Sequence, residues 1–251
     1  GERMIIHPAI SVAWRRSGFA LVVPLALVLA MPSPGEAQAS VLHPTELCRD
    51  HADASIVTFE DALLEARVRE SLRLDEQDDL TCDLVSDLTA LNVRPAGIES
   101  LAGIQNLSGL TSLYVRGTSI TDVSALSGLE RLTYLNLNRN SITDISALSG
   151  LTSLTRLFLN DNSITDIGAL SGLTGLTDIV LTLNSITDVS ALSELTALTE
   201  LRLSSNPGFS NIEPLLDHRE IDSVSLLDTR VSCANVARLQ SNGLFVFSAC
   251  Q

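Results

Sequence analysis

The sequence predicts an α/β solenoid, in which short coils stack so that their strands form one curved parallel sheet and a cap closes each end. Three observations carry this prediction. A 22-residue unit repeats without interruption over residues 110–197, every copy keeps leucine, isoleucine or valine at the same positions, and four cysteines flank the repeats. One coil cannot bury its apolar side chains alone, whereas stacked coils bury them in a continuous core.

The composition agrees with a folded chain and narrows the class of partner. Of the 251 residues, 45% are hydrophobic and 18% are charged, which is not the composition of a disordered acidic segment. All 16 basic residues are arginine, and the formal net charge is −14. Binding of nucleic acid needs clustered cations that neutralise phosphates. We therefore expect no nucleic-acid partner.

Residues 1–39 are expected to be an export signal peptide. Arg15 and Arg16 precede the apolar run Gly18–Met31, which at fourteen residues is too short to span a bilayer. The small first and last residues of Ala37–Ala39 fit a signal-peptidase cleavage site. The mature chain is expected to be secreted, periplasmic or at the cell surface, without an integral membrane span. An uncleaved N-terminal anchor is the alternative.

Residues 40–87 are expected to form an N-terminal cap. The segment Phe59–Glu70 has the spacing of an amphipathic helix. The apolar face of this helix is expected to carry Leu63, Leu64, Val68 and Leu72. Such a helix would cover the open end of the core beside the first coil.

Residues 88–231 are expected to form about seven coils. In the coil that starts at Leu132, the inward residues Leu135 and Leu137 alternate with polar ones, as in a short strand with one buried face. In four coils an asparagine follows the strand where the chain turns away, and a buried amide there can satisfy backbone groups that have no ladder partner. These residues are Asn140, Asn162, Asn184 and Asn206. Thr118 and Thr229 take this place in two other coils, and Ala96 takes it in the first.

Residues 232–251 are expected to form a C-terminal cap, with a helix over Cys233–Gly243 and a strand over Leu244–Phe247. Six coil spacings of about 4.8 Å separate the caps by roughly 29 Å, and a disulfide closes only over a Cα distance below about 7 Å. A bridge between the caps is therefore excluded. The predicted pairs are Cys48 with Cys82 and Cys233 with Cys250.

The repeat resembles leucine-rich repeats, and its 22-residue form with N-x-I-T-D-[IV] is similar to the bacterial internalin type. The resemblance covers residues 88 to 231 and extends more weakly into both caps. It implies a leucine-rich repeat fold and a protein partner, since internalin-type proteins are associated with attachment to host cells.

Catalysis, metal binding and a cofactor are not expected. The mature chain has three histidines, His43, His51 and His218, and none lies in a recognisable nucleophile or metal motif. One aspartate per coil forms a column of four carboxylates about 5 Å apart. Each is expected to cap the convex segment that follows it, with a calcium ladder as the alternative. These residues are Asp122, Asp144, Asp166 and Asp188.

The outward positions of the strands, here called the concave face, vary from coil to coil while the framework is constant. Three of the four aromatic residues within 88–220 lie there, together with several arginines, and both residue types are enriched at binding hot spots. The preference of large side chains for strands is the alternative reason. The candidate binding residues are Tyr114, Arg116, Tyr134, Asn136, Arg139, Arg156, Phe158 and Arg202, and Arg94 lies on the same face.

These observations predict a secreted recognition module without catalytic activity, which binds a protein ligand through the concave face. Two alternatives remain at this point. Aromatic and asparagine side chains on one surface also suit a glycan, and the caps could instead make this chain a structural component of an envelope complex.

Overall fold

The computed structural model describes residues 39–93 and 97–250. The chain divides into two compact units, residues 1–38 and 39–251, and only the second is described below. The predicted signal peptide, except for its last residue Ala39, lies outside the described residues, as does Arg94. Within the described ranges, no helix has the length and apolar character needed to cross a membrane.

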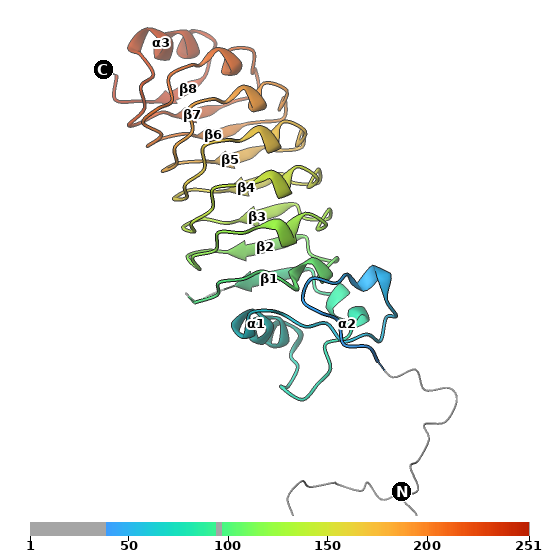
Figure 1. Cartoon of the computed structure of the whole chain (residues 1–251). Helices are drawn as coiled ribbons and strands as arrows, with labels where there is room; N and C mark the ends of the chain where they lie inside the picture. Colours follow the sequence, from blue (N-terminus) through green and yellow to red (C-terminus); the bar gives the residue numbers. More distant parts are fainter. Residues whose placement is uncertain (1–38, 94–96, 251) are drawn as a thin grey trace, which may run out of the picture. The chain divides into compact units, whose positions relative to one another are not determined.

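Eight strands form one parallel sheet in chain order, as Figure 1 shows for this part of the chain. They are β1 (Ala90–Val93), β2 (Ser112–Val115), β3 (Tyr134–Asn136), β4 (Arg156–Phe158), β5 (Asp178–Val180), β6 (Glu200–Arg202), β7 (Ser223–Ser225) and β8 (Phe245–Phe247). Equivalent residues of successive coils pair directly, for example Leu113 with Leu135 and Leu135 with Leu157. This register confirms the predicted stack of coils.

Short 3-10 segments return the chain along the opposite side of each coil. They are η2 (Ile104–Asn106), η3 (Ser124–Leu126), η4 (Ser146–Leu148), η5 (Gly168–Leu170), η6 (Ser190–Leu192) and η7 (Glu213–Leu215). The core lies between these segments and the sheet, and its leucine, isoleucine and valine side chains are almost completely shielded from solvent. The coil over residues 198–220 has one residue more than the 22-residue units before it, and Phe209, which is 0% exposed, fills its interior.

The asparagine at the end of each strand ties its coil to the coil before it. The Asn206 amide donates to the carbonyls of Leu203, at 2.8 Å, and of Leu181 in the preceding coil, at 3.0 Å. The Oδ1 atom of Asn206 accepts the Ile186 N–H at 2.9 Å. Asn140, Asn162 and Asn184 repeat these bonds. The predicted role in turn formation is confirmed, and the link between neighbouring coils is an addition to it.

The residue directly before each of these asparagines has a left-handed backbone. The position is held by Arg139, Asp161, Leu183 and Ser205, with φ between 56° and 61°, and Gly117 and Asp228 precede a threonine at the same place with φ 69° and 54°. These turns therefore share a left-handed residue whose side chain differs from coil to coil, and the coil of Gly117 has a second one at Ser119. Glycine is best suited to this conformation, and the other residues adopt it at a steric cost.

The N-terminal cap contains η1 (Cys48–Asp50), α1 (Ala62–Leu72) and α2 (Cys82–Ser86). Asp61 caps α1 by accepting the N–H groups of Leu63 and Leu64. Leu64 and Val68 are fully buried, as predicted. The prediction for Leu63 is wrong, because this side chain is 48% exposed beside Gly97, at the rim of the contact between α1 and the first coil.

The C-terminal cap contains α3 (Cys233–Ser241) and β8, which pairs with β7. Ser232 accepts the Asn235 N–H at the start of α3, and Gly243 ends the turn after it with φ 93°. Both predicted disulfides are present, with Cα separations of 5.5 Å for Cys48–Cys82 and 5.4 Å for Cys233–Cys250. Each bridge lies inside one cap.

One histidine, His218, is buried next to the last 3-10 segment of the array. His218 follows η7, is 5% exposed, and its Nε2 atom has no hydrogen-bond partner among the described residues. Burial lowers the pKa of His218 below its usual 6.5, although a hydrogen bond to the backbone of Leu192 and the nearby Asp217 act in the opposite direction. The neutral ring is therefore the form that fits the fold.

We expect His218 to reduce the stability of the protein as the pH falls. Because the pKa of His218 is depressed in the folded state, the unfolded chain binds the proton at a higher pH than the folded chain does. The stabilising effect of the neutral His218 ring is therefore complete above about pH 6.5 and is lost as the pH falls below that value. Urea unfolding of the parent and of His218→Gln should give a free-energy difference that shrinks from about pH 7 to pH 5. A difference that is constant over this range would contradict the prediction.

Candidate functional site

Three aromatic side chains form a continuous row on the concave face. Tyr114 pairs directly with Asn136, which places Tyr134 one diagonal step from Tyr114. The ring centroids of Tyr114 and Tyr134 are 4.6 Å apart, and those of Tyr134 and Phe158 are 5.2 Å apart. All three side chains are half-buried, and we call them the aromatic row. Rings at these separations contribute apolar area in one rigid surface.

The Tyr114 hydroxyl keeps its proton more firmly than a free phenol, although the nearby Arg156 acts in the opposite direction. Desolvation raises the pKa of Tyr114 above its usual 10.0, and the neighbouring Tyr134 phenol adds to the rise. The Tyr114 hydroxyl is therefore neutral at physiological pH and can donate a hydrogen bond to a partner.

Arginines border the aromatic row on several sides. The Arg156 guanidinium carbon lies 5.4 Å from the centroid of the Tyr134 ring, in cation–π geometry. Arg116 directly follows β2 and is exposed. Arg139 occupies the left-handed turn after β3, and its Nε atom is 3.9 Å from a carboxylate oxygen of Asp161. The border is positively charged, which favours acidic groups on a partner.

Three further outward residues are not free to contact a partner, because two are already bonded and one is buried. Arg202 is held by Glu200, with Nε 2.6 Å from the carboxylate, so its charge is already paired. The Asn136 oxygen accepts the Asn138 N–H at 3.1 Å. Val180 is in register with the outward residues Phe158 and Arg202 but is only 8% exposed, because its short side chain lies between these two larger ones.

Comparisons with known proteins agree with this architecture. A family model described as leucine rich repeat matches residues 108–164. The internalin InlF of Listeria monocytogenes is 34% identical with a TM-score of 0.69, over 76% of this chain and 56% of that one. The internalin InlC2 of the same species is 28% identical with a TM-score of 0.68, over 75% of this chain and 93% of that one. The chain has a leucine-rich repeat fold similar to that of these internalins, and it spans about half the length of InlF.

Other matches show the fold alone. A leucine-rich repeat protein of Leptospira interrogans is 20% identical with a TM-score of 0.61, and the alignment covers 65% of this chain and 44% of that one. No curated protein matches the sequence significantly.

The aspartate column of this internalin-like array serves the turns. The Oδ1 atoms of Asp122, Asp144 and Asp188 each accept the backbone N–H of the serine two residues later at 2.8 Å. Asp166 does the same with Gly168 at 2.7 Å. The bond to Ser146 lowers the pKa of Asp144 below its usual 3.8. These carboxylates therefore act as the caps that the sequence predicts.

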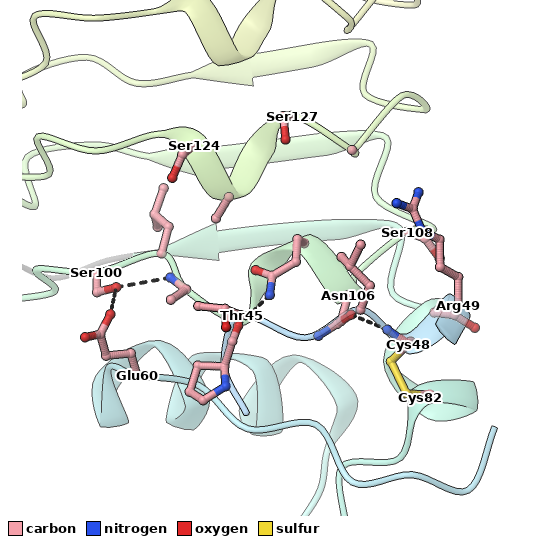
Figure 2. Close-up of a pocket in the computed structure, with 18 of the residues that line it drawn as sticks. Thr45, Cys48, Arg49, Glu60, Cys82, Ser100, Asn106, Ser108, Ser124 and Ser127 are labelled. Atoms are coloured by element: carbon pink, nitrogen blue, oxygen red, sulfur yellow. Dashed lines mark hydrogen bonds between the residues drawn. A yellow bond between two sulfur atoms is a disulfide. The ribbon is translucent and has the colours of Figure 1, made fainter. Parts of the chain in front are cut away.

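A pocket of about 720 Å³ lies where the N-terminal cap meets the first two coils of the array (Figure 2). Its polar side chains hold the two parts together. The Asn106 oxygen accepts the Cys48 N–H at 2.7 Å, and the Asn106 amide donates to the Glu46 carbonyl at 2.9 Å. Glu60 accepts the Ser100 hydroxyl at 2.6 Å. These contacts give the pocket lining a structural role.

Two further aromatic residues of the concave face are absent from the predicted binding residues. Phe245 and Phe247 lie on β8, in register with Ser223 and Ser225 of β7, so they continue the outward columns of the leucine-rich repeats. They are 64% and 50% exposed, and their ring centroids are 4.9 Å apart. Their alternation with Val246 was the available signal, but the segment was assigned only to the cap.

Proposed function

We propose that this protein is an exported recognition module without catalytic activity, which binds a protein partner through its concave face. The leucine-rich repeat fold is that of protein-recognition modules. The observation that carries the proposal is the aromatic row, three stacked rings bordered by Arg116, Arg139 and Arg156 on the side of the sheet opposite the core. Aromatic and arginine side chains are the residues that most often dominate binding energy at interfaces.

Further observations support binding and export. The two disulfides are typical of proteins that fold in an oxidising compartment outside the cytoplasm. A plant peptide hormone receptor, RGFR1, whose structure was solved in complex with RGF2, shares the fold at 19% identity and a TM-score of 0.53. That receptor is an example of this architecture with a polypeptide bound.

The hydrogen bonds of the asparagines favour a protein partner over a glycan. A glycan site would use the aromatic rings for stacking and asparagine amides for hydroxyl groups. The Asn136 oxygen, however, accepts the Asn138 N–H, and the Asn138 oxygen accepts the Asn160 N–H at 2.8 Å. Both oxygens are engaged in shaping the strand ends. A glycan array with the parent protein separates the two possibilities directly.

Substitution of the aromatic row tests the proposed function. We expect Tyr114→Ala, Tyr134→Ala and Phe158→Ala together to weaken binding of a partner captured from the envelope fraction by roughly 30-fold or more, because three hot-spot side chains are lost. The rings lie outside the solenoid core, so the circular dichroism spectrum should be unchanged. Surface plasmon resonance measures the affinity.

A double variant with Val41→Ala and Leu63→Ala is the matched control, since these apolar side chains are 64% and 48% exposed in the N-terminal cap. The control should bind like the parent. Unchanged affinity of the folded triple variant would disprove binding at the concave face, and loss of binding in the control would point to the cap instead.

A further inference from the structure

The last strand carries apolar side chains where a cap is expected to be polar. Phe245, Phe247 and the nearby Leu227 are 64%, 50% and 43% exposed, and we call them the terminal patch. Terminal repeats of solenoids usually present a polar surface, and exposed edge strands are usually protected by charge or proline. Strand β8 has neither charge nor proline. Its two exposed phenylalanines lower the solubility of the protein, and because they lie outside the core they do not stabilise it in return.

The direction of these side chains identifies the surface to which they belong. Because Phe245 aligns with Ser223 and Phe247 with Ser225, both rings project from the sheet on the same side as the aromatic row. The backbone of β8 is bonded to β7 through the Phe245 N–H and the Phe247 carbonyl. The rings therefore extend the concave face to the last strand of the sheet.

The surface between the two aromatic groups is polar and acidic. Strands β5 and β6 present Asp178, Glu200 and Arg202 there. Glu200 and Arg202 neutralise each other. Asp178 accepts a hydrogen bond from the Thr177 hydroxyl at 2.6 Å but has no ion-pair partner among the described residues. These three side chains therefore carry a net charge of −1 at the centre of the face, although Arg156 of the border lies in register beside Asp178.

We propose that the terminal patch is the second anchor of the concave site, so that one polypeptide segment of the partner contacts the aromatic row and β8 at the same time. The proposal rests on the function proposed above. By charge complementarity, the segment has apolar and acidic residues at the end over the aromatic row, a basic residue over Asp178, and apolar residues at the end over the terminal patch.

Strand spacing sets the length of the segment. Strands β3 and β8 are five positions apart in the sheet, and at about 4.8 Å per strand the two anchors are roughly 24 Å apart. About sixteen residues of α-helix cover this distance. Phe158 on β4 is four positions from β8, about 19 Å, which about thirteen helical residues cover. A helical peptide much shorter than this can reach only one anchor, which makes peptide length a second variable in the test.

Selection from a phage-displayed library of random 20-residue peptides on the exported chain tests this inference. Selected peptides that lose binding to the triple alanine variant of the aromatic row are synthesised and measured by surface plasmon resonance. We expect Phe245→Ala with Phe247→Ala to weaken them at least tenfold, mainly through faster dissociation. Hydrogen exchange of the complex should show protection on β3 and on β8 together.

Two further variants control for folding. Phe245→Thr with Phe247→Thr keeps residues that favour strands while it removes the rings, so it should weaken binding like the alanine pair and retain the parent circular dichroism spectrum. Val41→Ala with Leu63→Ala removes exposed apolar area elsewhere and should leave peptide binding unchanged.

The outcomes distinguish this inference from the proposed function. Peptides that need the aromatic row but bind both β8 variants like the parent would overturn the second anchor and leave the proposed function in place. If no selected peptide depends on the aromatic row, the proposed function fails, and the inference fails with it. A dimer in analytical ultracentrifugation that dissociates on substitution of Phe245 and Phe247 would show that a second copy covers the terminal patch, which also overturns the inference.

Discussion

Replacement of Asn206 by alanine should destabilise the protein by about 3 to 5 kcal/mol, because buried backbone groups left without a partner cost on the order of 1 to 3 kcal/mol each. Asn206 is 0% exposed. Its amide serves the carbonyls of Leu181 and Leu203, and its oxygen serves the Ile186 N–H. Alanine leaves all three groups inside the array without a hydrogen bond. The loss affects two coils at once, since two of these groups belong to the preceding coil.

Urea unfolding measured by circular dichroism checks this expectation. Asn160→Ala is the matched control, because the Asn160 side chain makes no hydrogen bond among the described residues, although it lies on the same side of the array. The control should change the free energy of unfolding by less than about 1 kcal/mol, as is usual for surface positions. If Asn206→Ala and Asn160→Ala have equal effects, the ladder of amides does not stabilise the stack.

Leu135→Ala is expected to cost about 2 to 5 kcal/mol by leaving a cavity in a closely packed core. Leu135 is 0% exposed and lies in the middle strand of the register Leu113, Leu135 and Leu157. Neighbouring coils hold the backbone on both sides, so the cavity cannot collapse. The midpoint of urea unfolding should fall.

The adjacent residue is the natural control for the core substitution. Tyr134 is one position away on the same strand but on the opposite face of the sheet. Tyr134→Ala should change stability much less than Leu135→Ala and should weaken binding, whereas Leu135→Ala in its folded form should bind like the parent. A reversal of this pattern would contradict the separation of core and concave face.

The sequence predicts the coils well because the same residue pattern forms the same local structure in each of them. Alternation along Leu135 and Leu137 identifies the inward face, and the repeated asparagine identifies the turn. What a single coil does not contain is the identity of its bonding partner across the stack. The link from Asn206 to Leu181 joins residues that are 25 positions apart, and only the register of the sheet brings them together.

The errors arise where the repeat ends or where side chains of unequal size are neighbours. Leu63 has helical spacing with Leu64 and Val68, but α1 contacts a single strand, and the contact is narrower than the apolar face of the helix. Phe245 and Phe247 were assigned to a cap because the 22-residue period stops before them. Their place on the concave face depends on the pairing of β8 with β7, which the 22-residue period does not predict.

The shared left-handed turn bears on how such an array changes length in evolution. Since Arg139, Asp161, Leu183 and Ser205 have nearly the same φ, the coils that contain them offer their neighbours equivalent carbonyls. Unequal recombination within the near-identical repeats can therefore add or delete a whole coil without a new junction. An event between β4 and β8 moves the aromatic row relative to β8 by one strand spacing, about 4.8 Å, while both surfaces stay intact. The number of coils can therefore change independently of the side chains that each binding surface presents.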